Sequence, residues 1–377
     1  MSGYGSAMTS TRSHLPATAG AILTIDLGAI RENYRRLRSR LDGVPAAAVL
    51  KADSYGLSAP AVAAALMDEG CDTFFVAHVS EAIALRPCVG DRVTIHVLNG
   101  LPPGAEDACL EAGAIPVLNS LEQIAAWRET ARQHGRRLPA TLQVDSGMAR
   151  IGLPPVDVER IAATPDALDG IEAVLVMSHL ACADEPQNPA NEAQRREFER
   201  LRAMLPAAPA SLANSSAIFL GPEFRFDLAR PGAALYGINP VPGTPNPMRQ
   251  AVRLEAKVIQ TREVGAGAGI GYGHAFKPSA PLPTATISLG YADGWPRRAE
   301  AAAWFDGVRL PFVGRVSMDS IILDISALPA DRLKGGDLVE LIGDRQTVDD
   351  IAALAGTIGY EILTSLGARF HRQYRDD

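Results

Sequence analysis

The 377-residue chain lacks several features that would place a protein in a particular class. Its four cysteines form no CxxC pair and show no metal-ligand spacing, so we expect reduced thiols, no metal and a cytoplasmic protein. It has no lysine- and arginine-rich block, and its formal net charge is −7, so we expect no nucleic-acid partner. No apolar run reaches the length of a membrane span, which predicts no membrane partner.

The composition indicates a folded protein of more than one domain. Hydrophobic residues make up 47% and charged residues 21% of the chain, which is enough apolar material for a sizeable core. The length exceeds that of one typical domain. Residues 1–21 are rich in Ser, Thr, Gly and Ala and lack the apolar segment of a signal peptide. We therefore predict a disordered N-terminal extension over residues 1–21, followed by two domains.

Short apolar strands alternate with helical stretches from about Leu23 to Asn239. Such repeated units predict a parallel sheet, and about eight of them in roughly 220 residues favour a closed barrel over an open doubly wound sheet. We expect a (β/α)8 TIM-type barrel over residues 22–240. The strands are predicted at residues 46–50, 73–77, 93–98, 115–118, 140–144, 173–177 and 211–213, and the helices include residues 59–69, 121–134 and 191–205.

Closely spaced prolines over residues 239–247 end this pattern and indicate a linker. Beyond the linker, strands are predicted at residues 253–261, 283–289, 310–316 and 320–325. One helix is well marked, because Thr347 and Asp350 offer a capping box before an apolar segment and Gly356 follows it. We expect a mostly-β C-terminal domain over residues 241–377.

Lys51 is the most informative residue of the chain. The apolar run 46–50 ends on this lysine, and a turn that contains Tyr55 and Gly56 follows. A lysine whose stem lies among apolar neighbours has a lowered pKa, which suits an amine nucleophile. The alternative is an ordinary lysine that closes a strand and points to solvent.

Other predicted strand ends also carry polar groups and glycines. In a β/α barrel the functional residues lie at the carboxyl ends of the strands. Together these ends offer a lysine, two arginines, hydroxyl groups and glycine amides, a set that suits an anionic, phosphate-bearing ligand joined to an amine. The segments are residues 145–150, 178–184, 214–215 and 230–237.

Each of these segments has a simpler interpretation. His179 and Asp184 could be metal ligands, but no further cluster completes a site, and a lone histidine is more often a hydrogen-bonded core residue. Arg230 could form a surface ion pair, yet its apolar neighbours favour a buried arginine with a specific partner. Residues 265–271 are rich in glycine but satisfy no GxGxxG frame, so we interpret them as a turn region.

The sequence resembles the alanine racemases, pyridoxal-phosphate enzymes of fold type III, from about Leu23 to the C-terminus. The likeness rests on six motifs in the family's order, at residues 48–56, 229–237, 271–273, 290–297, 314–319 and 360–361. It implies an amino-acid racemase, an isomerase with pyridoxal 5′-phosphate as its cofactor. It also implies interconversion of L-alanine and D-alanine, supply of D-alanine to peptidoglycan, and a homodimer with shared active sites.

The resemblance assigns a role to each matching residue. It implies that Lys51 bonds to the cofactor and acts as one catalytic base, and that Tyr272 of the partner subunit is the second. Arg150 and the backbone of Met318 would bind the substrate carboxylate, and Arg230 would face the pyridine nitrogen. The remaining cofactor-binding residues would be Tyr55, His179, Ser215, Gly232 and Tyr360, and the access channel would contain Asp184, Tyr291 and Arg297.

One position departs from the family. In many members a carbamylated lysine stands seven positions before the arginine that matches Arg150, and here that position is Gln143. A glutamine cannot carry a carbamate, although its amide oxygen can accept from a guanidinium. We therefore predict no carbamylation, and Arg150 held either by a neutral hydrogen bond or by another anion.

Three other functions are compatible with parts of the sequence. A racemase of broader specificity, or one that acts on serine, would share the same motifs. A non-catalytic pyridoxal-phosphate-binding protein could use the same barrel, but it would need neither a second base at Tyr272 nor a β domain. A fold-type III decarboxylase is disfavoured because the segments around Tyr272 and Met318 follow the racemase pattern.

Overall fold

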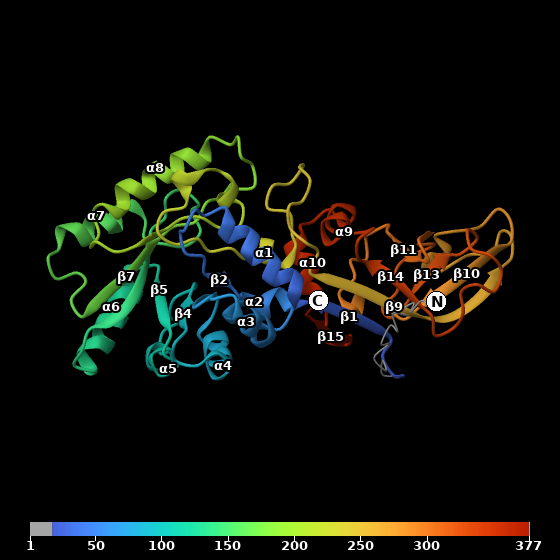
Figure 1. The fold of residues 1–377 in the computed structure, drawn as a ribbon, viewed down its shortest axis with the longest axis horizontal. Coiled ribbons are helices and arrows are strands. Elements are labelled where there is room, and N and C mark those ends of the chain that lie inside the picture. Colours follow the sequence, from blue (N-terminus) through green and yellow to red (C-terminus); the bar gives the residue numbers. More distant parts are fainter. Residues whose placement is uncertain (1–16, 377) are drawn as a thin grey trace, which may run out of the picture. The chain divides into compact units, whose positions relative to one another are not determined.

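Seven short parallel strands form one sheet in the computed structural model, which describes residues 17–376 (Figure 1). Their order in the sheet is their order in the sequence, and each neighbouring pair is parallel. Most of their side chains are buried, as expected for strands covered on both faces. The strands are β2 (Ala48–Val49), β3 (Thr73–Val76), β4 (Thr94–Val97), β5 (Ile115–Leu118), β6 (Leu138–Gln143), β7 (Ile171–Met177) and β8 (Ala210–Ser211).

Residues 229–231 close this sheet into a barrel. Ala229 pairs in parallel with Ala46, and Arg230 pairs in parallel with Asn214, so the segment bridges the two ends of the sheet. The backbone N–H of Val49 donates to the carbonyl of Pro231 at 2.9 Å. The predicted (β/α)8 architecture is thereby confirmed. A closing segment of three residues that contains a proline has no strand signal, which is why the sequence did not identify it.

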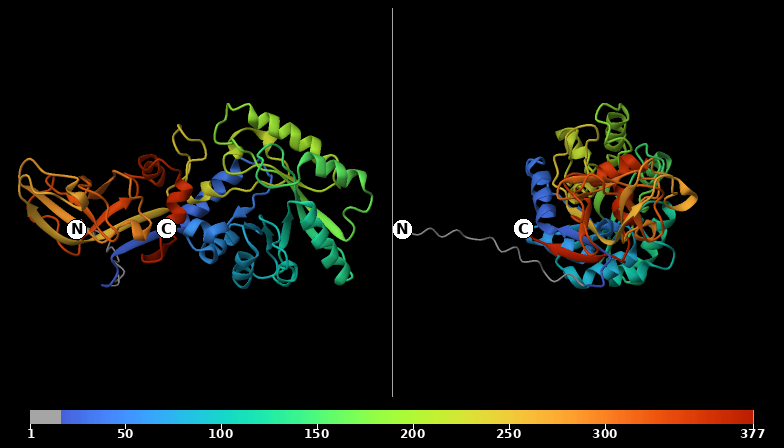
Figure 2. Two further views of the ribbon diagram at one scale, coloured as in Figure 1. Left: turned by 180° about the vertical axis from the view of Figure 1, so that it is seen from behind. Right: turned by 90° about the vertical axis from the view of Figure 1, so that its right-hand side faces the viewer.

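Helices surround these strands on the outside, as the view from behind also shows (Figure 2). In α1, Asp26 caps the helix by accepting from the N–H of Ala29 at 2.7 Å, and Ile30 and Leu37 are buried on one face. The helices are α1 (Leu27–Ser39), α3 (Ala59–Asp68), α4 (Val79–Val89), α5 (Glu106–Glu111), α6 (Leu121–Gln133), α7 (Pro155–Ala163) and α8 (Ala190–Arg202). Three helices, α3, α6 and α8, follow the predicted ranges closely, and no range was predicted for the others.

Two helices from the C-terminal part of the chain belong to the same compact unit as the barrel. This unit comprises Ile25–Val252, Gly343–Leu366 and the residues from Tyr374. Helix α9 (Val348–Ala355) has the predicted capping box of Thr347 and Asp350, and it ends at Gly356 with a φ of 67°. Helix α10 (Gly359–Ser365) packs on the segment that follows Lys51. The barrel unit is thus completed by residues distant in sequence.

The second unit is rich in strands, as predicted. It comprises the residues up to Thr24, Arg253–Ile342 and Gly367–Gln373. The predicted strand 310–316 ends early, because the chain leaves β12 at Pro311 and Gly314 has a φ of 73°. Its sheet has the order β12-β11-β14-β9-β1-β15, in which β1 is Ala21–Asp26, with β10 beside β9 and β13 beside β10. The strands are β9 (Val252–Val264), β10 (Leu282–Ile287), β11 (Ala302–Phe305), β12 (Val308–Pro311), β13 (Ile321–Asp324), β14 (Leu338–Ile342) and β15 (His371–Arg375).

Strand β1 (Ala21–Asp26) lies in this second sheet, between β9 and β15. The expectation that the β/α alternation begins at about Leu23 was therefore wrong for this strand. Its two neighbours come from the C-terminal half of the chain, and local periodicity cannot reveal such distant pairing.

The predicted N-terminal extension, residues 1–21, lies mostly outside the described residues. Residues 17–20 are described as turn and bend just before β1. Over residues 17–376, no helix combines the length and the apolar character that a membrane crossing requires.

Candidate active site

A cavity of about 370 Å³ lies at the carboxyl ends of the barrel strands. All of its lining residues belong to the barrel unit. Among the described residues, the lining includes Lys51, Arg150 and Arg230 but no aspartate or glutamate. The cavity therefore favours an anionic ligand. The lining consists of Val49, Lys51, Tyr55, Ala77, Leu98, Asn99, Gln143, Arg150, Ile151, Met177, His179, Asn214, Ser215, Arg230, Gly232, Ala233 and Tyr360.

Lys51 opens a short turn with an unusual backbone. The four residues after it, Ala52 to Tyr55, all have φ values between 53° and 57°, so the chain makes a left-handed helical turn within α2 (Lys51–Gly56). For residues with a Cβ, this conformation costs roughly 1–2 kcal/mol each. The surrounding contacts must offset that energy, and such strain is characteristic of functional sites. The turn holds Tyr55 inward, where its side chain is only 6% exposed.

The charge state of Lys51 is set by burial and by its neighbours. Burial lowers the pKa of its amine, and the positive charge of Arg150 lowers it further, while the carboxylate of Glu81 acts in the opposite direction. A larger fraction of the amine is therefore neutral than for an exposed lysine. Only the neutral amine is a nucleophile or a base.

Arg230 is a buried part of the cavity lining, and no acidic side chain among residues 17–376 pairs with it. Its side chain is 3% exposed; one nitrogen donates to the hydroxyl of Ser211, and another donates to the carbonyl of Ser178 at 2.7 Å. Burial lowers the pKa of Arg230 to about 9, so the group stays charged at neutral pH. This agrees with the expectation of a buried arginine that has specific partners.

His179 lines the same cavity as a neutral imidazole. Burial lowers its pKa to about 3, and the charges of Arg230, Arg150 and Lys51 contribute to the shift. Asp184, its possible partner in a metal site, is exposed and does not line the cavity. In the described part of the chain, no three His, Cys, Asp or Glu side chains gather as a metal site would require.

Ser215, Gly232 and two tyrosines form one wall of the cavity. The hydroxyl oxygen of Ser215 accepts from the backbone N–H groups of Gly232 and Ala234, at 2.9 and 3.2 Å, so its own proton is free to be donated. A Cβ at Gly232 would lie 2.6 Å from the hydroxyl of Tyr55, so a larger residue would disrupt this wall. The rings of Tyr55 and Tyr360 are 6.0 Å apart. Hydroxyl groups around a glycine in this arrangement suit a phosphate group.

Arg150 has an exposed side chain at the cavity, in the loop that follows β6. Its guanidinium makes no hydrogen bond or ion pair with the other described residues, 17–376. Gln143 also lines the cavity, but its amide nitrogen donates to the carbonyl of Ile151 at 3.3 Å. The guanidinium is thus available to bind an anion.

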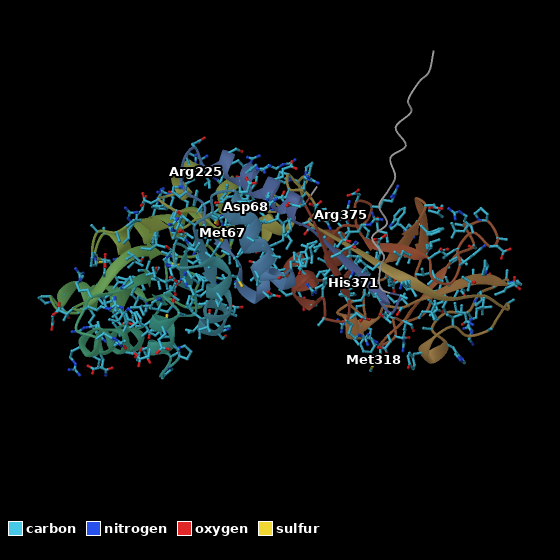
Figure 3. All side chains as sticks on the ribbon, turned by 60° about the horizontal axis from the view of Figure 1, so that its bottom comes forward. Met67, Asp68, Arg225, Met318, His371 and Arg375 are labelled. Carbon is cyan, nitrogen blue, oxygen red and sulfur yellow. The ribbon has the colours of Figure 1, made fainter. Side chains whose placement is uncertain are left out.

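The other predicted site residues belong to the strand-rich unit. Tyr272, Tyr291 and Met318 are 67%, 40% and 52% exposed, and Arg297 is also exposed. Figure 3 shows Met318 at the surface of this unit. The segments that carry Tyr272, Tyr291 and Met318 adjoin one another. The N–H of Ala292 donates to the carbonyl of Met318 at 3.0 Å. A Cβ at Gly314 would lie 3.0 Å from the carbonyl of Ile270, so the segment before Met318 contacts the segment before Tyr272.

Sequence reasoning did not identify several cavity residues. Ala77, Leu98, Asn99 and Met177 lie at or just after the ends of β3, β4 and β7. Their positions could have been found by collecting every predicted strand end, whether or not it carried a reactive group. Apolar residues at such positions shape the cavity without leaving a chemical motif.

Comparison with known proteins extends this geometry. Residues 25–240 match the family model described as "Alanine racemase, N-terminal domain", and residues 251–374 match "Alanine racemase, C-terminal domain". A curated relative from Mesorhizobium japonicum, named "Alanine racemase, catabolic", is 67% identical over 358 residues, which are 95% of this chain and 94% of the relative. A relative of the same name from Agrobacterium fabrum is 52% identical over 97% of this chain and 95% of its own length.

Solved structures are similar along nearly the whole chain. The alanine racemase of Bartonella henselae, described with covalently bound pyridoxal phosphate, has a TM-score of 0.91 and 42% identity and covers 94% of this chain and 99% of its own. The biosynthetic alanine racemase of Pseudomonas aeruginosa has a TM-score of 0.87 and 36% identity, over 94% of this chain and 99% of its own.

Proposed function

Because the chain belongs to the alanine racemase family, we propose that it interconverts L-alanine and D-alanine with pyridoxal 5′-phosphate bound in the barrel cavity. It is an amino-acid racemase. The observation that carries the proposal is the position of Lys51, a lysine of lowered pKa in an otherwise cationic cavity without acidic lining residues.

The cavity residues fit the cofactor. Lys51 would supply the amine for covalent attachment, and Arg230, which is charged at neutral pH, would disfavour protonation of the cofactor's pyridine nitrogen. His179 adds no charge beside the ring. The phosphate would be held by the hydroxyl groups of Tyr55, Ser215 and Tyr360, beside Gly232, where a Cβ would lie 2.6 Å from the hydroxyl of Tyr55. When bound, the cofactor supplies the electron sink that makes the α-hydrogen of an amino acid removable.

Inversion at the α-carbon needs a proton acceptor on one face and a proton donor on the other. We assign Lys51 to the face of D-alanine and Tyr272 to the face of L-alanine. The substrate carboxylate is bound by Arg150 and the backbone of Met318. This role for Arg150 is supported by its place in the cavity lining, where its guanidinium has no hydrogen-bond or ion-pair partner among the described residues.

Tyr272 comes from the partner subunit of a head-to-tail homodimer in this proposal. The high exposure of Tyr272, Tyr291 and Met318 supports this dimer, since large, mainly apolar side chains gathered at a surface indicate an interface. Each site is then completed by the other chain. The access channel contains Asp184, Tyr291 and Arg297.

Removal of bicarbonate is expected to leave the activity unchanged, because Gln143 cannot form a carbamate. The check is a rate measurement in degassed and in bicarbonate-supplemented buffer, with peptide mass spectrometry on the segment that contains residue 143. The variant Gln143→Lys is the matched control, since it restores a side chain that carbon dioxide can modify. Loss of wild-type activity on bicarbonate removal, restored by its return, contradicts this account.

The substrate range is tested with purified protein and a panel of single enantiomers. We expect loss of optical activity with L-alanine and with D-alanine, and slower or no conversion of serine. Faster conversion of serine or of several larger amino acids indicates a serine or broad-specificity racemase. A protein that binds the cofactor but converts no amino acid is a cofactor-binding protein without this activity.

The physiological direction is not set by the site, because L- and D-alanine have equal free energies in water. The sequence suggested supply of D-alanine to peptidoglycan, but the relatives at 67% and 52% identity are named catabolic. We therefore propose that the enzyme serves the use of D-alanine as a nutrient in addition to its supply to the cell wall. We also propose that it acts in the cytoplasm, where its four free cysteines stay reduced. A deletion strain separates the two roles. Failure to grow on D-alanine as a nutrient indicates the catabolic role, and a need for added D-alanine in ordinary medium indicates the role in cell-wall supply.

A further inference from the structure

The left-handed turn after Lys51 is anchored from outside by one carboxylate. The N–H of Ala52, the residue next to Lys51, donates to Oε1 of Glu81 at 2.7 Å. A helical turn leaves its first N–H groups without partners inside the turn, so an external acceptor is required there. Glu81 provides that acceptor at the point where the strained backbone begins.

Glu81 is itself fixed by the neighbouring strand end. Its Oε2 accepts from the N–H of Ala77 at 2.6 Å and from the N–H of His78 at 3.1 Å, just after β3 and at the start of α4. Strands β2 and β3 are paired in parallel, so their carboxyl ends are adjacent. One carboxylate therefore links the end of β3 to the turn that carries Lys51.

The same carboxylate contributes charge to the site. Lys51 is faced by Arg150 from the loop after β6 and by His179 from the loop after β7, in addition to Glu81 from α4. Burial and Arg150 lower the pKa of Lys51, and only the charge of Glu81 raises it. His179 is neutral and therefore adds no charge beside Lys51. Glu81 thus limits how far the ammonium form is destabilised.

We propose that Glu81 is a positioning residue for Lys51, which fixes the left-handed turn through Ala52 and supplies the anion that balances Arg150. The proposal rests on the assignment of Lys51 as the cofactor lysine in the proposed function. It differs from a plain helix-capping role, in which Glu81 would stabilise α4 through His78 and leave Lys51 unaffected.

The chain offers a matched control for that difference. Asp350 is the third residue of α9, as Glu81 is the third residue of α4, and its carboxylate accepts from the N–H of Thr347 at 2.8 Å. It lines no part of the cavity. Asp350→Asn therefore removes a capping carboxylate without changing the surroundings of Lys51.

The test compares Glu81→Gln, Glu81→Asp and Asp350→Asn in the full chain freed of cofactor. The pH dependence of amine labelling at Lys51 is followed by peptide mass spectrometry, and the chain has only three other lysines, Lys257, Lys277 and Lys334. With Glu81→Gln, we expect the labelling midpoint to fall by about one pH unit, the size that loss of a neighbouring opposite charge produces. Glu81→Asp keeps the charge, so its midpoint should stay near that of the wild type.

Amide hydrogen exchange of the peptide around residues 50–57 tests the geometric part. We expect faster exchange at Ala52 in both Glu81 variants, because the glutamine has one oxygen for three N–H groups and the aspartate is shorter. Asp350→Asn should change neither readout. If Glu81→Gln does not fold, faster exchange in Glu81→Asp supports the proposal, and wild-type exchange in that variant overturns it.

The proposal is also overturned if folded Glu81→Gln keeps both the wild-type labelling midpoint of Lys51 and the wild-type amide exchange at Ala52. If that variant then differs from the wild type only by a lower melting temperature, Glu81 acts as a helix cap alone. Both readouts use the protein without cofactor. Failure of the proposed function would instead appear as cofactor attached to another lysine, with the labelling shift of Lys51 still present. The two failures are therefore distinguishable.

Discussion

Lys51→Ala is expected to abolish both covalent cofactor attachment and racemisation. The substitution removes the amine for attachment and one of the two bases, so we expect a loss of more than about 10³-fold in rate. The visible absorption of the bound cofactor should disappear as well. Absorption spectra, and racemisation rates measured from each enantiomer, check this outcome.

The composition of the chain makes the assignment unambiguous. Lys51 is the only lysine before Lys257, and the other three all belong to the strand-rich unit. Borohydride reduction of the wild-type holoenzyme should fix the cofactor on the peptide that contains Lys51. Lys334→Ala is the control, because Lys334 is exposed and does not line the cavity. A reduced adduct on another lysine in Lys51→Ala would show that the assignment is wrong.

Tyr272→Phe is expected to slow racemisation by roughly 10²- to 10⁴-fold, the range typical of one lost general acid–base group. Cofactor binding should survive, because the phosphate and ring contacts are assigned to the barrel unit. The variant should still exchange the α-hydrogen of D-alanine with solvent through Lys51, while that of L-alanine exchanges much more slowly. Proton NMR in deuterium oxide measures both exchanges, and equal exchange of both enantiomers would remove Tyr272 from this role.

Heterodimers test whether the tyrosine acts across the subunit interface. When Tyr272→Phe and Lys51→Ala subunits are combined, one of the two shared sites should carry both bases, and part of the activity should return. Homodimers of each variant are the controls. Verified heterodimers without recovered activity would mean that Tyr272 acts within its own chain.

The sequence predicted those features that depend on local patterns. Repeated apolar strands and helices indicated the barrel, and the capping box of Thr347 and Asp350 marked α9 with its end at Gly356. Lys51 was recognised because a charged residue ends an apolar run. Its neighbours at the other strand ends followed from the geometry that all parallel strands share.

Features that depend on distant contacts were not predictable in this way. The place of β1 beside β9 and β15 and the barrel closure by residues 229–231 are tertiary pairings without a local signal. The left-handed turn contains four residues that ordinarily avoid this conformation, so propensity argued against it. The hairpin of β11 and β12 does have a local signal in the sequence, the Asp306-Gly307 pair, and both residues adopt a positive φ in the structure.

Product isotope analysis tests the central claim of a two-base racemase most directly. The wild-type holoenzyme is incubated with L-alanine in deuterium oxide and stopped early, and the separated enantiomers are analysed by mass spectrometry. The account predicts D-alanine that carries deuterium at the α-carbon, because Lys51 delivers a proton exchanged with solvent on the face opposite Tyr272. D-alanine that retains the original α-hydrogen would contradict it, since one group would then remove and return the same proton.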